Sequence, residues 1–178
     1  KFHGVGGPLA VEKMRASFKV LDLFMEAAEE FGYPKTSDFN TGNNEGMGYF
    51  PLNVKNGYRC STAVGYLNPI KKRKNLKILT NAHIKNIEFE NRKAVSVNFW
   101  KNNQLLNVKT NKEIILSAGT VGSPHILQVS GVGPGDLLKK NNINVVKDHP
   151  SVGKNLHDHL MLRPVYKVKN LDTLNDIY

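Results

Sequence analysis

The segment from Glu113 to Gly131 most constrains what this chain can fold into. Its apolar run Ile114-Ile115-Leu116 leads directly into Ala118-Gly119, and Ser123-Pro124 follows four residues later. A short apolar run bounded by small residues predicts a strand covered on both faces, over 113–117, as in a parallel sheet. Serine as a cap, with proline in the first turn, predicts a helix from residue 123 that ends at Gly131. The segment therefore predicts a strand, a tight turn and a helix.

Further strands are expected before this segment, separated by turns rich in asparagine. In the surest of them, Val95, Val97 and Phe99 recur with a period of two, as a half-buried strand requires. A second short helix is expected over 136–140. The expected strands span 76–79, 84–89, 94–100, 105–108 and 143–146.

The first third of the chain predicts one amphipathic helix and a long loop. Apolar residues recur every three or four positions between Ser17 and Phe31, with Ser17 as the expected cap and Gly32 as the expected end. Residues 36–51 are rich in Asn and Gly, which predicts an irregular loop of the kind that borders functional sites. A short helix is expected over 61–66.

Composition excludes several classes of protein. With 178 residues, 40% of them hydrophobic and 22% charged, the chain is globular in composition. Its single cysteine, Cys60, excludes an internal disulfide and is expected as a small buried residue. No apolar run approaches the roughly 18 residues of a membrane span. The chain begins with Lys1 rather than Met and stops inside an unfinished apolar pattern, so we expect an internal fragment of a longer polypeptide.

The net charge of +10 is compatible with nucleic acid or another polyanion as a partner. The densest block, Lys71-Lys72-Arg73-Lys74, has no aromatic residues beside it for base stacking, which favours a solvated loop and no nucleic-acid partner. His157-Asp158-His159 could supply metal ligands, but no partner ligand stands at a familiar spacing, so a structural role is favoured and no metal site is expected. The glycine clusters at 4–7 and 131–133 lack the third glycine of the dinucleotide fingerprint.

A series of longer motifs carries more information than these isolated features. The run from Gly119 to Gly133 fills every fixed position of one signature, and Arg73-Lys74-Asn75-Leu76 precedes it while Val152-Gly153-Lys154-Asn155-Leu156-His157-Asp158-His159 follows it. Together these motifs resemble the glucose-methanol-choline (GMC) oxidoreductases. The opening His3-Gly4 and Gly7-Pro8-Leu9 are similar to the animal glucose dehydrogenase-like branch of that family. The chain departs from the usual pattern at His149 and Ser151.

The resemblance implies an α/β (mixed α+β) fold with part of a discontinuous Rossmann-like FAD-binding domain and part of a substrate domain with an antiparallel sheet. It implies a partial substrate domain in 1–75, a partial FAD-binding domain in 76–135 and a return segment in 136–178. It further implies that Ile84, Ala118 and Gly119 lie near the dinucleotide of FAD. The family's glycine-rich fingerprint and catalytic histidine fall outside the matching region, so no catalytic residue is assigned within this chain, which is expected to be inactive alone.

The function implied is hydride transfer from a CH–OH group of an alcohol or sugar to FAD, with oxygen or a quinone as the electron acceptor. The sequence does not fix the compartment, and the resemblance implies secretion as one option. Two alternatives stay open: a GMC-like binding protein without catalytic activity, and a basic module that binds polyanions.

Overall fold

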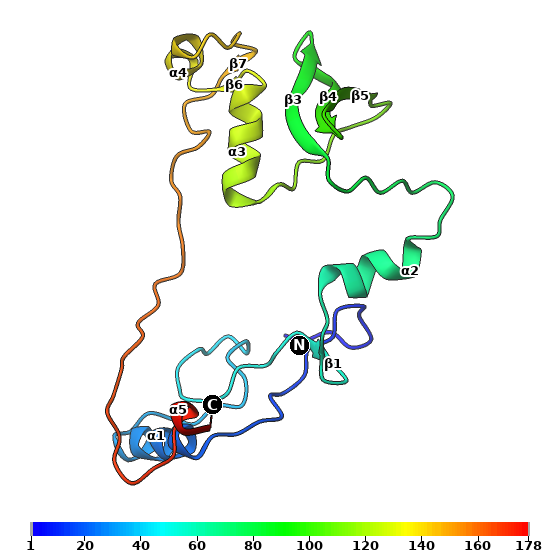
Figure 1. The fold of residues 1–178 in the computed structure, drawn as a ribbon. Helices are drawn as coiled ribbons and strands as arrows, with labels where there is room; N and C mark the ends of the chain where they lie inside the picture. The colour runs from blue at the N-terminus through cyan, green and yellow to red at the C-terminus, as the bar shows by residue number, and fades with distance from the viewer. Residues whose placement is uncertain (1, 178) are drawn as a thin grey trace. The chain divides into compact units, whose positions relative to one another are not determined.

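The computed structural model describes residues 2–177, and Figure 1 shows their fold. The chain divides into two compact units. Unit 1 contains the residues up to Ile78 and those from Pro164 onward, and unit 2 is Leu79–Arg163. The expected mixture of helices and strands is confirmed, whereas the assignment of these parts to substrate and FAD-binding domains stays a prediction. No helix in residues 2–177 is long and apolar enough to cross a membrane.

Unit 1 is built on helix α1 (Lys19–Glu30), which begins two residues after the expected cap. Phe18, not Ser17, is the capping residue, and its backbone N–H donates to the hydroxyl of Tyr49 at 3.0 Å. That hydroxyl in turn donates to Asp22 at 2.8 Å, so a residue from the long loop replaces the local cap. The expected end is confirmed, since Gly32 has φ +90° directly after the helix.

The remainder of unit 1 is short elements and irregular chain. The loop over 36–51 is confirmed as irregular, and it is closed by backbone hydrogen bonds between Thr36 and Met47 and between Met47 and Pro34. Cys60 is 2% exposed, as expected of a small buried residue. The expected strand over 76–79 is wrong, because these residues form no ladder. The elements are β1 (Val54–Lys55), β2 (Tyr58–Arg59), a π-helix η1 (Ala63–Leu67) that continues into α2 (Asn68–Ile70), and α5 (Leu174–Ile177).

Unit 2 contains an antiparallel sheet of three strands in the order β3 (His83–Glu90), β4 (Lys93–Lys101) and β5 (Gln104–Lys109). Both connections are two-residue loops, Asn91-Arg92 and Asn102-Asn103, in which every residue has positive φ. This is the conformation of the primed turns that match the twist of a hairpin, and asparagine tolerates it. The imperfect alternation of β3 is explained by register shifts between Ile84 and Asn86 and between Glu88 and Phe89.

The two faces of this sheet differ in polarity. The buried residues Ile87 and Phe99 lie in the apolar rows, whereas Glu88 and its cross-strand neighbours form a polar cluster on the other face. Ser96 and Asn98 both donate to the carboxylate of Glu88, and Asn107 donates to it from β5. These hydrogen bonds, the one from Ser96 first, lower the pKa of Glu88.

Helix α3 (Gly119–Val129) packs against β3, and Figure 1 shows the two elements side by side. The helix begins four residues earlier than expected, with Pro124 inside it, and Gly131 at φ +89° follows its end as expected. Its last turn is tied to the sheet by Ser130, which is 7% exposed. The Ser130 hydroxyl accepts the backbone N–H of Ile87 at 2.8 Å and donates to the carbonyl of Ile126 at 2.5 Å.

A small parallel pair completes unit 2 beyond α3. Strand β6 (Val132–Gly133) pairs with β7 (Lys147–Asp148), and the expected helix is confirmed between them as α4 (Gly135–Lys140). Asp148 accepts the backbone N–H of Gly135 at 2.9 Å and so holds the start of α4. Leu138 of α4 is 1% exposed and joins Ile126 of α3 in the core.

Two strands expected in unit 2 are not formed. Residues 113–117 are unpaired, because no other strand of residues 2–177 lies beside them to complete a ladder. The expected strand over 143–146 lies instead at 147–148, where Lys147 and Asp148 pair with Val132 and Gly133. Just before it the chain passes close to Gly131, where a Cβ would lie 2.4 Å from the carbonyl oxygen of Asn144. A local apolar pattern therefore does not by itself predict where a strand forms, because a strand also needs a partner strand from elsewhere in the chain.

Candidate functional site

The turn at the start of α3 contains two of the residues expected near the cofactor. Gly119 has φ +82°, which favours glycine, and a Cβ at this position would meet no atom within 4 Å. Ala118 occupies the N-cap position of the helix, and its backbone N–H donates to the Ser123 hydroxyl at 3.1 Å. Both Ala118 and Gly119 are exposed. The turn is therefore an open, small-residue surface on which a ligand could approach the backbone closely.

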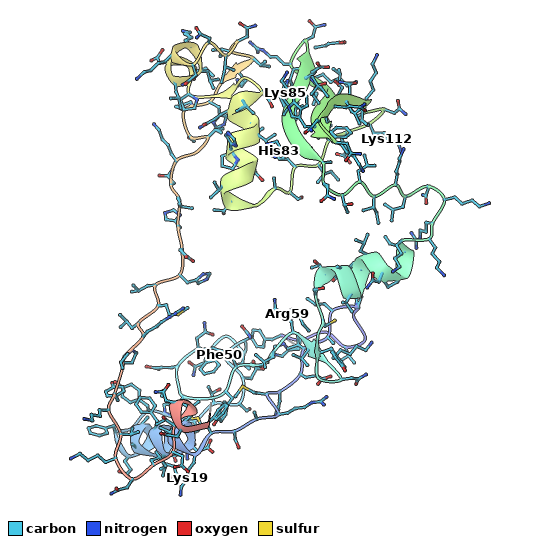
Figure 2. All side chains as sticks on the ribbon, viewed as in Figure 1. Lys19, Phe50, Arg59, His83, Lys85 and Lys112 are labelled. Atoms are coloured by element: carbon cyan, nitrogen blue, oxygen red, sulfur yellow. The ribbon has the colours of Figure 1, made fainter. Side chains whose placement is uncertain are left out.

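Ile84, the third expected residue, lies near the start of β3. It pairs with Phe99 of β4 and is half-buried, between the exposed side chains of His83 and Lys85, which Figure 2 labels on this strand. Figure 1 shows β3 and α3 beginning at the same end of unit 2. The structure therefore places Ile84 and the Ala118-Gly119 turn toward one end of the unit, and their contact with a cofactor stays a prediction.

A cleft of about 590 Å³ lies along α3, from the turn at its start to Gln128 near its end. We call it the α3 cleft. One wall is α3 itself, including Thr120, Pro124 and His125, and the other is the segment from Gly153 to His157. The segment bends sharply, because Gly153 has φ +83° and Asn155 has φ +58°. The cleft thus joins α3 to a segment that begins 24 residues after the end of the helix.

The polar lining of the α3 cleft, with one positive charge from Lys154, favours an anionic ligand. Lys154 and the imidazoles of His125 and His157 line it, and no Asp or Glu does among the residues described. The N-cap residue of α3 is an alanine, whose side chain cannot accept from the N–H groups of Gly119 to Val121, and the Ser123 hydroxyl accepts only the N–H of Ala118. This combination suits a phosphate-bearing group better than a neutral one.

The His157-Asp158-His159 sequence does not converge on a single point. In residues 2–177, no group of three or more His, Cys, Asp or Glu side chains is arranged to hold a metal ion. Asp158 accepts the backbone N–H of His159 at 2.8 Å, and the side chains of both residues are exposed. The segment differs from a metal site in that only His157 of the three faces the cleft.

One residue of the site was missed by the sequence reasoning. Gln128 lines the α3 cleft, and its Nε2 donates to the carbonyl of Val152 at 3.0 Å. The available signal was a polar residue between Leu127 and Val129 in the part of α3 expected to be buried. That pattern does not name a partner 24 residues away, so only the structure reveals the contact.

The fold and the site define a class of protein. The family model of the GMC oxidoreductases matches residues 2–161, and the chain belongs to this family. The expected family membership is therefore confirmed. Two signature residues have structural roles: the hydroxyl of Ser130 joins α3 to β3, and Gly131 allows the backbone of Asn144 to pass close to it.

Among curated relatives, the chain is 42% identical over 170 residues to an oxygen-dependent choline dehydrogenase of Pectobacterium atrosepticum, covering 94% of this chain and 30% of that protein. It is 39% identical over 160 residues to the mitochondrial choline dehydrogenase of Homo sapiens, covering 90% of this chain and 27% of that protein. The chain thus spans less than a third of the length of these relatives.

Solved structures agree with this assignment. An FAD-dependent oxidoreductase from Chaetomium thermophilum matches with a TM-score of 0.83 and 32% identity, over 88% of this chain and 28% of that one. Pyridoxine 4-oxidase from Mesorbium loti matches with a TM-score of 0.77 and 30% identity, over 84% of this chain and 30% of that one.

Proposed function

We propose that this chain is the central part of an FAD-dependent oxidoreductase that oxidises a CH–OH group of a small alcohol. The observation that carries the proposal is the coincidence of the complete signature from Gly119 to Gly133 with an open turn and a cleft free of carboxylates at the start of the same helix. Similarity to choline dehydrogenases over 94% of the chain and to an FAD-dependent oxidoreductase structure supports it.

The residues present fit a bound dinucleotide. Gly119 offers backbone without a side chain in the way, and Lys154 supplies positive charge in the α3 cleft. When bound, FAD supplies the oxidant that accepts a hydride from the carbinol carbon. The role we assign to this chain is to hold and orient the dinucleotide, through Ile84, Ala118 and Gly119. The base that takes the hydroxyl proton is not assigned to any histidine of the chain.

The substrate proposed is a primary alcohol such as choline, because the relatives named above are choline dehydrogenases. The expected glucose dehydrogenase-like branch stays a prediction, with a sugar as its substrate. Oxygen or a quinone remains the proposed electron acceptor. A structure similar to this chain at 26% identity and a TM-score of 0.77 is an aryl-alcohol oxidase, which is also consistent with an alcohol substrate.

The test is to express the complete gene product and record its visible absorption spectrum. We expect a flavin spectrum that is bleached anaerobically by choline and more slowly by glucose. Bleaching by glucose alone would favour the sugar-oxidising branch. An intact, folded protein that contains no flavin and takes up none would refute the proposed function in favour of a GMC-like protein without catalytic activity.

A further inference from the structure

The side chain of Gln128 lies in a slot formed by two glycines. A Cβ on Gly153 would lie 2.6 Å from Nε2 of Gln128, and a Cβ on Gly133 would lie 2.9 Å from its Cγ. Neither position could carry a side chain while Gln128 keeps its place. Because Gly153 also has φ +83°, both sterics and backbone geometry reserve this position for glycine.

Gln128 also makes a connection that no other side chain duplicates. Within residues 2–177, its bond to the Val152 carbonyl is the one side-chain hydrogen bond between α3 and the segment 149–163. The backbone bond from His149 joins the start of this segment to Gly133 of β6, and the bonds from Val152 to His149 and from Lys154 to Ser151 lie within the segment, so none of these bonds reaches α3. The attachment of the loop to the helix at this point therefore depends on Gln128.

The attached segment is one wall of the α3 cleft. Residues 153–157 follow directly after the bond to Val152, and they line the cleft opposite Thr120 and Pro124. Their side chains are exposed, so burial contributes little to holding them. Without the bond from Gln128, the wall that contains Lys154 and His157 would be free to move away from α3.

We propose that Gln128 is a positioning residue for the cofactor: its hydrogen bond attaches the loop at Val152 to α3 and thereby holds residues 153–157 in place as one wall of the α3 cleft. The effect on the cofactor rests on the proposed function. The attachment of the loop to α3 is a property of the chain, whether or not flavin is bound. Gln128 needs no contact with the cofactor to act in this way.

The test compares Gln128→Glu and Gln128→Met with wild type in the complete protein. Glutamate keeps the shape of Gln128 but cannot donate when ionised, and methionine keeps the volume without a charge. The matched control is Gln104→Glu, because Gln104 is exposed at the start of β5. Two readouts are needed: the rate of tryptic cleavage after Lys154 without added flavin, and the dissociation constant for FAD.

We expect both Gln128 variants to be cleaved after Lys154 about three to ten times faster than wild type, the range expected for loss of one hydrogen bond. The dissociation constant for FAD should rise by a similar factor, with the spectrum of the bound flavin shifted because the cleft wall has moved. Cleavage after Lys93, inside β4, should stay unchanged, and Gln104→Glu should behave as wild type.

Three outcomes would overturn the inference. The first is wild-type cleavage after Lys154 in both Gln128 variants, and the second is faster cleavage there with unchanged FAD affinity. The third is an equal increase after Lys154 and Lys93, which would mean general destabilisation. A wild-type protein that binds no FAD would instead refute the proposed function. The rate of cleavage after Lys154 would then test only whether Gln128 attaches the loop to α3. If Gln128→Glu does not fold, Gln128→Met decides.

Discussion

Replacing Ser130 with alanine isolates one buried hydrogen bond between α3 and the sheet. Ser130 is 7% exposed, and its hydroxyl accepts the Ile87 N–H at 2.8 Å. That N–H lies on the outer edge of β3, where no further strand of residues 2–177 accepts it. The carbonyl of Ile126 keeps a partner in the variant, because the backbone N–H of Ser130 also donates to it at 3.1 Å. Ser130→Ala therefore leaves one buried donor without an acceptor.

The expected cost follows from that count. An unsatisfied buried donor destabilises by about 1–3 kcal/mol, and the small change in volume adds little. The local free energy of opening should fall by the same amount, so the amides of β3 should exchange roughly 5 to 150 times faster. Hydrogen–deuterium exchange of a peptide covering residues 83–90 measures this directly, and a urea titration measures the loss of overall stability.

Ser151→Ala is the matched control, because Ser151 is exposed and its hydroxyl makes no hydrogen bond within residues 2–177. Its exchange and stability should stay within about 0.5 kcal/mol of wild type. If Ser130→Ala also stays within that limit, the reasoning is refuted, and the Ile87 N–H must find another acceptor.

Three further predictions concern other parts of the chain. Hydrogen bonds from Ser96 and its neighbours lower the pKa of Glu88, so its charge stabilises the sheet at pH values above the usual glutamate range, and this contribution is lost as the pH falls through the lowered pKa. Glu88→Gln should therefore have a lower melting temperature than wild type at neutral pH and the same melting temperature in acid. Thermal melts followed by circular dichroism from about pH 7 to pH 3 would show this. Leu138→Ala should cost about 2–5 kcal/mol in a urea titration, since Leu138 is 1% exposed, and a cost below about 1 kcal/mol would contradict its place in the core. Gly119→Ala and Gly57→Ala should each lower the free energy of unfolding by about 1–2 kcal/mol, because φ is +82° and +84° at these positions. Only Gly119→Ala should weaken FAD binding in a fluorescence titration. Equal effects of the two variants on FAD binding would count against the predicted cofactor contact.

Much of unit 2 could be predicted from the sequence because its contacts are local. The strands of the three-stranded sheet lie within a residue or two of their expected bounds, since Asn91 and Asn102 mark two-residue turns between alternating patterns. The end of α3 before Gly131 is likewise encoded by glycine after the last apolar turn. These features depend on residues close together in sequence.

The wrong predictions, two strands and one helix cap, concern features that depend on residues far apart in sequence. Residues 76–79 and 113–117 have strand-like composition, but a strand exists only where another strand accepts its hydrogen bonds, and residues 2–177 supply none. At α1, Ser17 looked like the local cap, yet Phe18 is the capping residue and its N–H donates to Tyr49 of the loop.

The candidate site was predictable only in part. Ala118 and Gly119 followed from the resemblance to a known family, and their contact with the cofactor is still a prediction. The α3 cleft and Gln128 were not foreseen, because the cleft depends on a loop that returns to α3 some 24 residues later.

The two hairpins of unit 2 have a consequence for the order of folding. Each closes through two residues that already favour the left-handed conformation, so residues 83–109 can pair with very small loop-closure entropy. Hairpins of this kind form within about 1–10 μs, whereas contacts of longer range form more slowly. We therefore expect the sheet to form first and to present the Ile87 edge as a template. Docking of Ser130 would then come late, and the α3 cleft would be among the last parts of the unit to form.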